Sequence, residues 1–161
     1  MSNGDVLLVQ YLRRAYQAVD GLWFMMVEQA DGFPKALQLD EQVWQVLAKI
    51  EAREARELLG CTGNDPGDLA RCFSLKLRAD GHAFECAVTH EDVCFAITGC
   101  TWYDLLRKSG RDALALTVSQ IICPTEGRVW CREFGDEYTF EMPCTMCGGA
   151  SRCEMTFRRT T

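Results

Sequence analysis

The hydrophobic pattern of this chain changes its period near residue 82, and this change restricts the folds that the chain can adopt. Before that point, apolar residues recur every three or four positions, as one face of a helix requires. Beyond it, residues 83–88 and 93–98 are short alternating or apolar runs separated by the polar segment His90-Glu91-Asp92, which is typical of a β-hairpin. A helical first part followed by strands indicates the α+β class.

The part before the hairpin is predicted to form three helices. The first covers residues 5–29, and the second runs from a cap at Asp40 to residue 58, after a break at residues 31–34. The third begins with Asp65 as N-cap and Pro66 at the first helical position, and it ends near residue 79. Residues 74–78 also alternate, so a strand is the alternative there.

More helices and two strands are predicted after the hairpin. Thr101 to Asp104 resembles a capping box with Thr101 as the cap, and the helix it opens ends at Ser109-Gly110. Asp112 begins another helix that runs to Pro124, and residues 125–134 form a further helical stretch. Residues 138–142 and 153–157 alternate as strands. We therefore predict one domain over residues 1–161, with a helical N-terminal part (1–60) and a part (83–157) in which helices pack on the hairpin and the two C-terminal strands.

Composition and charge exclude several classes of function. At 48% hydrophobic and 25% charged residues the chain is globular. The net charge of −6 argues against nucleic-acid binding, which relies on concentrated Lys and Arg. No apolar run approaches membrane-spanning length, and the first residues do not resemble a secretory leader. We expect a protein of the reducing cytoplasm, where thiols stay free or bind metal.

Three of the ten cysteines lie in one short run near the C-terminus. Cys144 and Cys147 are two residues apart, Pro143 and Gly148-Gly149 turn the chain around them, and Cys153 follows. A tight turn of this kind brings thiolates close enough to share a zinc ion, whose sulfur ligands lie about 2.3 Å from the metal. The spacing predicts a metal site but no reaction.

A fourth soft ligand is available from Cys123, which precedes Pro124. Four thiolates would form a closed, structural zinc site, and exchange of one of them for Glu141 would not open it. The same thiolates also suit an iron–sulfur cluster. The remaining alternative is that these cysteines are small apolar core residues.

The C-terminal half resembles a known superfamily. The segments that carry the resemblance are Ile97-Thr98-Gly99-Cys100-Thr101-Trp102, Ile122-Cys123-Pro124-Thr125-Glu126-Gly127, Phe140-Glu141 and Gly149-Ala150-Ser151-Arg152-Cys153-Glu154-Met155-Thr156-Phe157. Over residues 83–157 the chain is similar to the 4-vinyl reductase domain and to proteins described as L-2-amino-thiazoline-4-carboxylic acid hydrolase-like. The resemblance implies a small-molecule-binding domain with a helical layer against a four-stranded antiparallel sheet, often a homodimer, with a metal site near the C-terminus.

The resemblance also implies a ligand set for the metal. In sensory members the ligands are one helix cysteine, a Glu-x-x-Cys pair and a later cysteine, which correspond here to Cys123, Glu141, Cys144 and Cys153. Cys147 is an additional thiol in this chain and is the alternative to Glu141 as fourth ligand.

The sequence offers fewer candidates for catalysis or ligand binding. Cys100 is the best candidate nucleophile, because it precedes a predicted helix whose N-terminus would lower the pKa of its thiol. A polar-aromatic pocket where the first two helices meet could be lined by Asp20, Trp23, Glu28, Trp44 and Glu51, and Trp102 is a further candidate ligand-binding residue. Core packing of these aromatic residues is the alternative. His82 and His90 are expected to be solvated loop residues.

These observations favour a sensor or accessory domain that binds a small molecule and carries a structural zinc. A hydrolase of a small heterocyclic or thiol-derived substrate, using Cys100, is the alternative. An iron–sulfur redox protein is a third interpretation. The chain shows no Cys-His-Asn or Ser-His-Asp pattern and no phosphate-binding glycine loop, which is why binding is preferred to catalysis.

Overall fold

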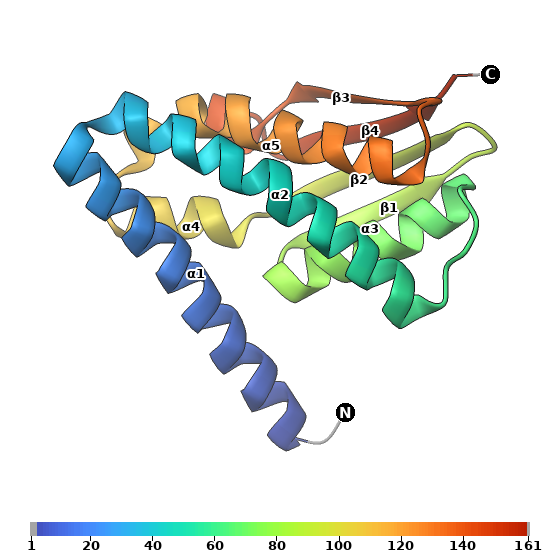
Figure 1. Cartoon of the computed structure of the whole chain (residues 1–161), viewed down its shortest axis with the longest axis horizontal. Coiled ribbons are helices and arrows are strands. Elements are labelled where there is room, and N and C mark those ends of the chain that lie inside the picture. Colours follow the sequence, from blue (N-terminus) through green and yellow to red (C-terminus); the bar gives the residue numbers. More distant parts are fainter. Residues whose placement is uncertain (1–2, 161) are drawn as a thin grey trace.

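The computed structural model describes residues 3–160 and contains a four-stranded sheet covered by helices (Figure 1). The helices are α1 (Asn3–Asp31), α2 (Phe33–Leu59), α3 (Pro66–Asp80), α4 (Thr101–Lys108), α5 (Asp112–Phe134) and the short 3-10 helix η1 (Met146–Gly148). The strands are β1 (Ala83–Val88), β2 (Asp92–Gly99), β3 (Tyr138–Cys144) and β4 (Cys153–Arg159). The predicted α+β class, with helices on a four-stranded antiparallel sheet, is confirmed.

The sheet has the strand order β1-β2-β4-β3, and every neighbouring pair is antiparallel. Its register places apolar residues opposite one another on one face. In β2 and β4, Phe95 lies opposite Met155 and Ile97 opposite Cys153, while Phe140 of β3 lies opposite Phe157. This inner face is covered by α3 next to β1 and β2 and by α5 next to β3.

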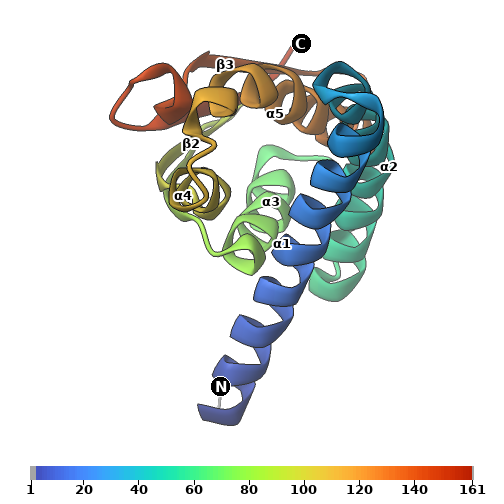
Figure 2. The same ribbon diagram turned by 90° about the vertical axis from the view of Figure 1, so that its left-hand side faces the viewer.

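A second layer of helices lies outside α3 and α5. α2 packs along α5 and α3, and α1 packs on α2 and leaves the body of the domain toward its N-terminus (Figure 1 and Figure 2). Among residues 3–160, none of the helices combines the length and the apolar character needed to cross a bilayer.

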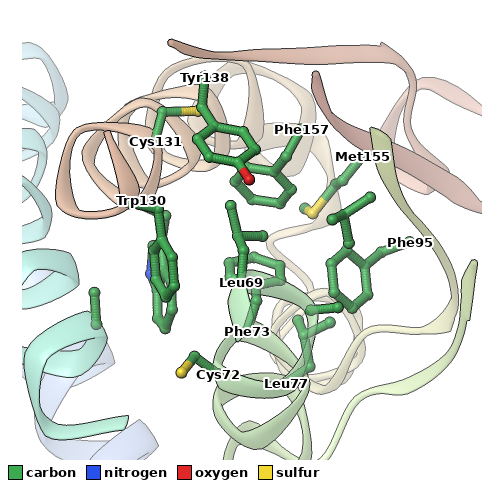
Figure 3. Packing of buried hydrophobic residues seen from close by; sticks show 14 of the residues in the cluster. Leu69, Cys72, Phe73, Leu77, Phe95, Trp130, Cys131, Tyr138, Met155 and Phe157 are labelled. Carbon is green, nitrogen blue, oxygen red and sulfur yellow. The ribbon is translucent and has the colours of Figure 1, made fainter. Parts of the chain in front are cut away.

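Phe73 of α3 lies at the centre of the core (Figure 3). Its ring centroid is 5.0 Å from those of Phe95 and Trp130 and 4.9 Å from that of Phe157. Aromatic pairs at such separations pack edge to face and add to the stabilisation from their buried area. The core therefore joins α3 and α5 to the middle of the sheet.

Two predicted helix boundaries were wrong. α2 begins at Phe33, seven residues before Asp40, because Gly32 turns the chain at a φ of 87° and Pro34 is tolerated in the first turn of a helix. The cap of α4 is Cys100, whose Sγ accepts a hydrogen bond from the amide of Tyr103 at 3.5 Å. Residues 74–78 belong to α3, so the strand alternative was also wrong.

α5 is one continuous helix, although two stretches were predicted on either side of Pro124. Proline cannot donate the amide hydrogen bond to the carbonyl of Gln120, and it normally kinks or ends a helix. Here the residues after it, including Trp130 and Phe134, are fully buried in the core, and their packing keeps the helix intact.

α5 approaches β3 closely at Gly127. A Cβ at this position would lie 2.4 Å from a ring carbon of Phe140, and that ring is packed on Phe157 with centroids 5.0 Å apart. We expect Gly127→Ala to lower the free energy of unfolding by about 1–3 kcal/mol, the usual cost of overpacking a core. Urea unfolding followed by circular dichroism measures this change.

The matched control is Gly21→Ala in the middle of α1, where a Cβ would meet no atom within 4 Å. This variant should be more stable than the wild type by up to about 1 kcal/mol, because alanine is the better helix former. Equal effects of the two substitutions would contradict the close approach of α5 and β3.

Candidate functional site

A cavity of about 110 Å³ lies between the helices and the inner face of the sheet. Its wall combines residues from all five α-helices with residues from β2, β3, η1 and β4. The lining residues with polar, thiol or large aromatic side chains include Tyr16, Asp20, Asp40, Trp44, Lys76, Asp80, His82, Cys100, Thr101, Trp102, Ser119, Cys123, Glu126, Cys147 and Cys153. The wall contains a cluster of charged groups and a cluster of thiols, and the two meet on α5, where Cys123 lies three residues before Glu126. Burial and then the nearby Glu126 carboxylate raise the pKa of the Cys123 thiol.

Lys76 is the centre of the charged cluster. Its side chain is buried, its Nζ lies 3.0 Å from a carboxylate oxygen of Asp80 one turn along α3, and it makes a close ion pair with Glu126 of α5. Burial lowers the pKa of Lys76, but the carboxylates of Asp80, Glu126 and Glu51 raise it by more, so the pKa lies well above its ordinary value. Lys76 is therefore a permanent buried cation.

More carboxyl groups surround Lys76 than one cation can balance. Burial raises the pKa of Glu51 to about 8, and that of Asp40 to about 7 with help from neighbouring Asp20. Burial also raises the pKa of Asp20. With pKa values of about 8 and about 7, Glu51 and Asp40 are partly protonated at neutral pH, and a cation bound beside them would favour their charged forms.

His82 joins α3 to α4 at the edge of the cavity. Its Nδ1 accepts a hydrogen bond from the amide of Thr101 at 3.2 Å, and the Thr101 hydroxyl donates to the carbonyl of Asp80 at 2.8 Å. Burial and then the charge of Lys76 lower the pKa of His82 to about 4, so the imidazole is neutral at pH 7. The expectation that His82 is a solvated loop residue was wrong.

Four thiols also line the cavity: those of Cys100, Cys123, Cys147 and Cys153. They come from the start of α4, from α5, from η1 and from β4, so residues far apart in the sequence meet here. Burial raises the pKa of all four thiols. For Cys100 it outweighs the hydrogen bonds from the Tyr103 and Trp102 amides at the start of α4, so the predicted lowering of its pKa by the helix N-terminus was wrong.

Two of the predicted metal ligands, Glu141 and Cys144, lie outside the cavity lining. Glu141 pairs with Thr156 on the outer face of the sheet and lies 3.6 Å from Arg158, with 57% of its side chain exposed. Cys144 does not line the cavity, and its Sγ lies 3.7 Å from the carbonyl of Arg152. The predicted set containing Glu141 does not fit a shared metal, because Glu141 and Cys153 lie on opposite faces of the sheet.

The remaining cysteines do not form a ready metal site either. Within residues 3–160, no three or more His, Cys, Asp or Glu side chains are placed so that they could hold a metal ion. Cys123, Cys147 and Cys153 nevertheless face the same cavity, together with Cys100.

Of the predicted ligand-binding residues Trp23, Glu28 and Trp102, one lines the cavity and two lie outside it. Trp102 lines the cavity. Trp23 lies on an outer groove between α1 and α2, and Glu28 makes a close ion pair with Arg111 at the start of α5.

Asp20 and Trp44 were predicted to line a pocket and do line the cavity, whereas Lys76 and Glu126 were not predicted, although the sequence carries a signal for them. Lys76 follows Cys72 by four residues and Phe73 by three, so a helix places it on the core-facing side. Glu126 lies four residues after Ile122 and four before Trp130, so it too is on the core-facing side of its helix. A charged residue inside a buried stripe predicts a buried partner of opposite charge.

A protein-family model matches most of the chain. Residues 2–117 match the model of a family described as "Family of unknown function (DUF6125)". The chain belongs to this family. The DUF6125 match includes Lys76, Asp80 and Cys100 and ends before the other three thiols of the cavity. Neither a curated protein nor a solved structure matches the chain.

Proposed function

We propose that this protein is a small-molecule-binding domain, acting as a sensor or accessory protein, whose ligand occupies the cavity between α3, α5 and the sheet. The observation that carries the proposal is the mixed wall of the cavity, which combines buried charges around Lys76 with Trp102 and four thiols. Binding pockets typically combine a mainly apolar wall with a few convergent polar groups. The proposed compartment is the reducing cytoplasm, where these thiols stay reduced.

The size and charge of the cavity suggest the class of ligand. A cavity of about 150 Å³ lined by apolar groups holds a benzene molecule, so 110 Å³ suits a ligand of about five or six non-hydrogen atoms. The carboxyl groups of the wall outnumber the ammonium group of Lys76; they belong to Asp20, Asp40, Asp80 and Glu126. A small amine with a short apolar part fits this arrangement better than a carboxylate.

Three probes of nearly equal size test this proposal: n-butylamine, 1-butanol and butyrate. Titration followed by tryptophan fluorescence should show the tightest binding for the amine and the weakest for butyrate, because Trp44 and Trp102 line the cavity. Binding of the amine should strengthen several-fold from pH 6 to pH 8, as Asp40 loses its proton near pH 7.

A variant with a blocked cavity provides the control. Ser119 is buried in the wall on α5, and Ser119→Phe fills the space in front of it. This variant should lose binding of the amine while it keeps its helical circular dichroism. Tighter binding of butyrate than of butylamine would contradict the proposed class of ligand.

The hydrolase alternative has less support. A cysteine nucleophile needs a thiolate, and burial raises the pKa of the Cys100 thiol. The DUF6125 family has no assigned function that would favour catalysis.

Metal binding is a second proposal, because four soft donors face one cavity. Elemental analysis of protein purified without air, together with its visible spectrum, distinguishes zinc, an iron–sulfur cluster and free thiols. One zinc per chain, lost when Cys123 or Cys153 is replaced by serine but not when Cys86 is, would support a zinc site. Cys86 is an exposed cysteine of β1 and is therefore the matched control.

A further inference from the structure

The exposed side of α1 carries a regular apolar stripe. Its residues are Leu8, Leu12, Ala15, Val19, Leu22 and Met26, with successive spacings of four, three, four, three and four. The five large side chains among them are each between 52% and 57% exposed, and Ala15 is exposed as well. This spacing is the heptad pattern of a seam between two packed helices.

α1 contacts the rest of the domain through its other, more polar side. Arg13 donates hydrogen bonds to the backbone carbonyls of Ala79 and Arg78, at 2.6 and 2.8 Å. Gln17 donates to the hydroxyl of Thr101 at 2.9 Å. A surface helix normally buries its apolar stripe and exposes its polar face. α1 is oriented the other way, which leaves the stripe without a partner among residues 3–160.

The apolar surface continues from α1 onto α2. Beside the stripe, Tyr11 and Trp23 are 72% and 69% exposed. Across the groove that separates the two helices, Val43, Val46 and Ile50 of α2 are each more than half exposed. The stripe and its neighbours comprise ten large apolar side chains. At roughly 100 Å² of exposed surface for each, the face has on the order of 1,000 Å² of apolar surface. A standard stable interface buries about 800 Å² on each partner. The face is large enough for a permanent contact.

We propose that this face of α1 and α2 is the interface of a homodimer, in which α1 packs against α1 of a second copy and the four helices form a bundle. None of the stripe residues is charged, so the face needs no partner of opposite charge and is complementary to itself. In a dimer with two-fold symmetry, both copies contribute the same stripe to the contact.

A membrane surface is a poorer partner for the same face. Helices that lie on membranes carry lysine and arginine along their polar side. Residues 1–34 contain only Arg13 and Arg14 as basic residues, Arg13 is bonded to α3, and the chain has a net charge of −6. These charges do not favour an anionic lipid surface.

The proposed dimer also covers one wall of the ligand cavity. Tyr16, Asp20 and Asp40 line both the cavity and the outer groove. A second copy seated in the groove would therefore shield these groups from water.

Sedimentation velocity of the full chain tests the interface directly. The wild type should sediment as a dimer at about 10–100 μM, and Leu12→Glu and Val19→Glu should shift it to the monomer with unchanged helical circular dichroism. Leu58→Glu is the matched control, because Leu58 is 68% exposed on α2 and lies outside the stripe and the groove. This control should remain dimeric.

The melting temperature of the wild type provides a second measurement that does not depend on folded variants. A dimer melts at higher temperature as protein concentration increases, whereas a monomer does not. A wild type that sediments as a monomer at every concentration, with a constant melting temperature, overturns the proposal. A monomer that binds phosphatidylcholine vesicles through α1 overturns it in favour of a membrane surface.

Discussion

Replacing Lys76 with methionine is expected to lower the free energy of unfolding by about 3–5 kcal/mol at pH 7. Lys76 is buried between Asp80 and Glu126, and its removal leaves the buried carboxylate of Glu126 without a counter-charge. An unpaired charge inside a protein costs several kilocalories per mole, whereas loss of a solvated pair costs little. Urea unfolding of the variant and the wild type measures the difference.

The pH dependence of the lost stability distinguishes an unpaired Glu126 carboxylate from a simple loss of packing. Without Lys76, the folded-state pKa of Glu126 rises further, so folding favours the protonated carboxyl. The loss should then be smaller at pH 5 than at pH 8, because the stability supplied by a carboxyl with a raised pKa falls as pH increases.

Two further variants complete the Lys76 experiment. The double variant Lys76→Met with Glu126→Gln should recover part of the loss, because it removes the unpaired charge. Lys35→Met is the control, since Lys35 is exposed and donates a hydrogen bond to Gln38 one turn along α2, and it should change stability by less than about 0.5 kcal/mol. A Lys76→Met protein as stable as the wild type would show that the pair is not buried as described.

Replacing Phe73 with alanine should cost about 3–5 kcal/mol in the free energy of unfolding. The ring is 1% exposed and lies within 5.0 Å, centroid to centroid, of Phe95, Trp130 and Phe157. Its removal leaves a cavity whose walls come from α3, α5 and the sheet, which cannot all move inward together.

Phe84→Ala is the comparison for Phe73→Ala. Phe84 belongs to edge strand β1, is only partly buried, and its ring centroid lies 5.8 Å from that of Phe95. Its loss should be clearly smaller in the same urea titration. Equal losses for the two variants would contradict the central position of Phe73.

The elements with local signals could be predicted from the sequence. The start of α3 follows from Asp65 and Pro66, and its end from Gly81, which adopts a φ of 83°. The start of α2 was misplaced because a proline close behind a glycine is typical of a break. At Gly32 and Pro34 this pair in fact forms a corner and the first turn of a helix.

The candidate site was harder to predict, because its residues meet only through the tertiary fold. No residue near Cys100 in the sequence indicates that β4 brings Cys153 to the same cavity. The continuation of α5 beyond Pro124 likewise has no local signal. The position of Glu141 on the outer face of the sheet could have been predicted from the sequence. It follows Phe140 in an alternating strand, and Phe140 faces the core, so Glu141 must face away from it.

The proline inside α5 divides this helix into two parts of unequal stability. Beyond Pro124, Trp130 and Phe134 hold the helix in the core, whereas Ser119 and Cys123 before it line the cavity. The missing backbone bond at Pro124 leaves the two parts less tightly coupled than in an unbroken helix. We therefore expect the first part to open more readily than the second, with amide hydrogens that exchange sooner. Such an opening gives a ligand a route to the cavity while the aromatic core stays folded.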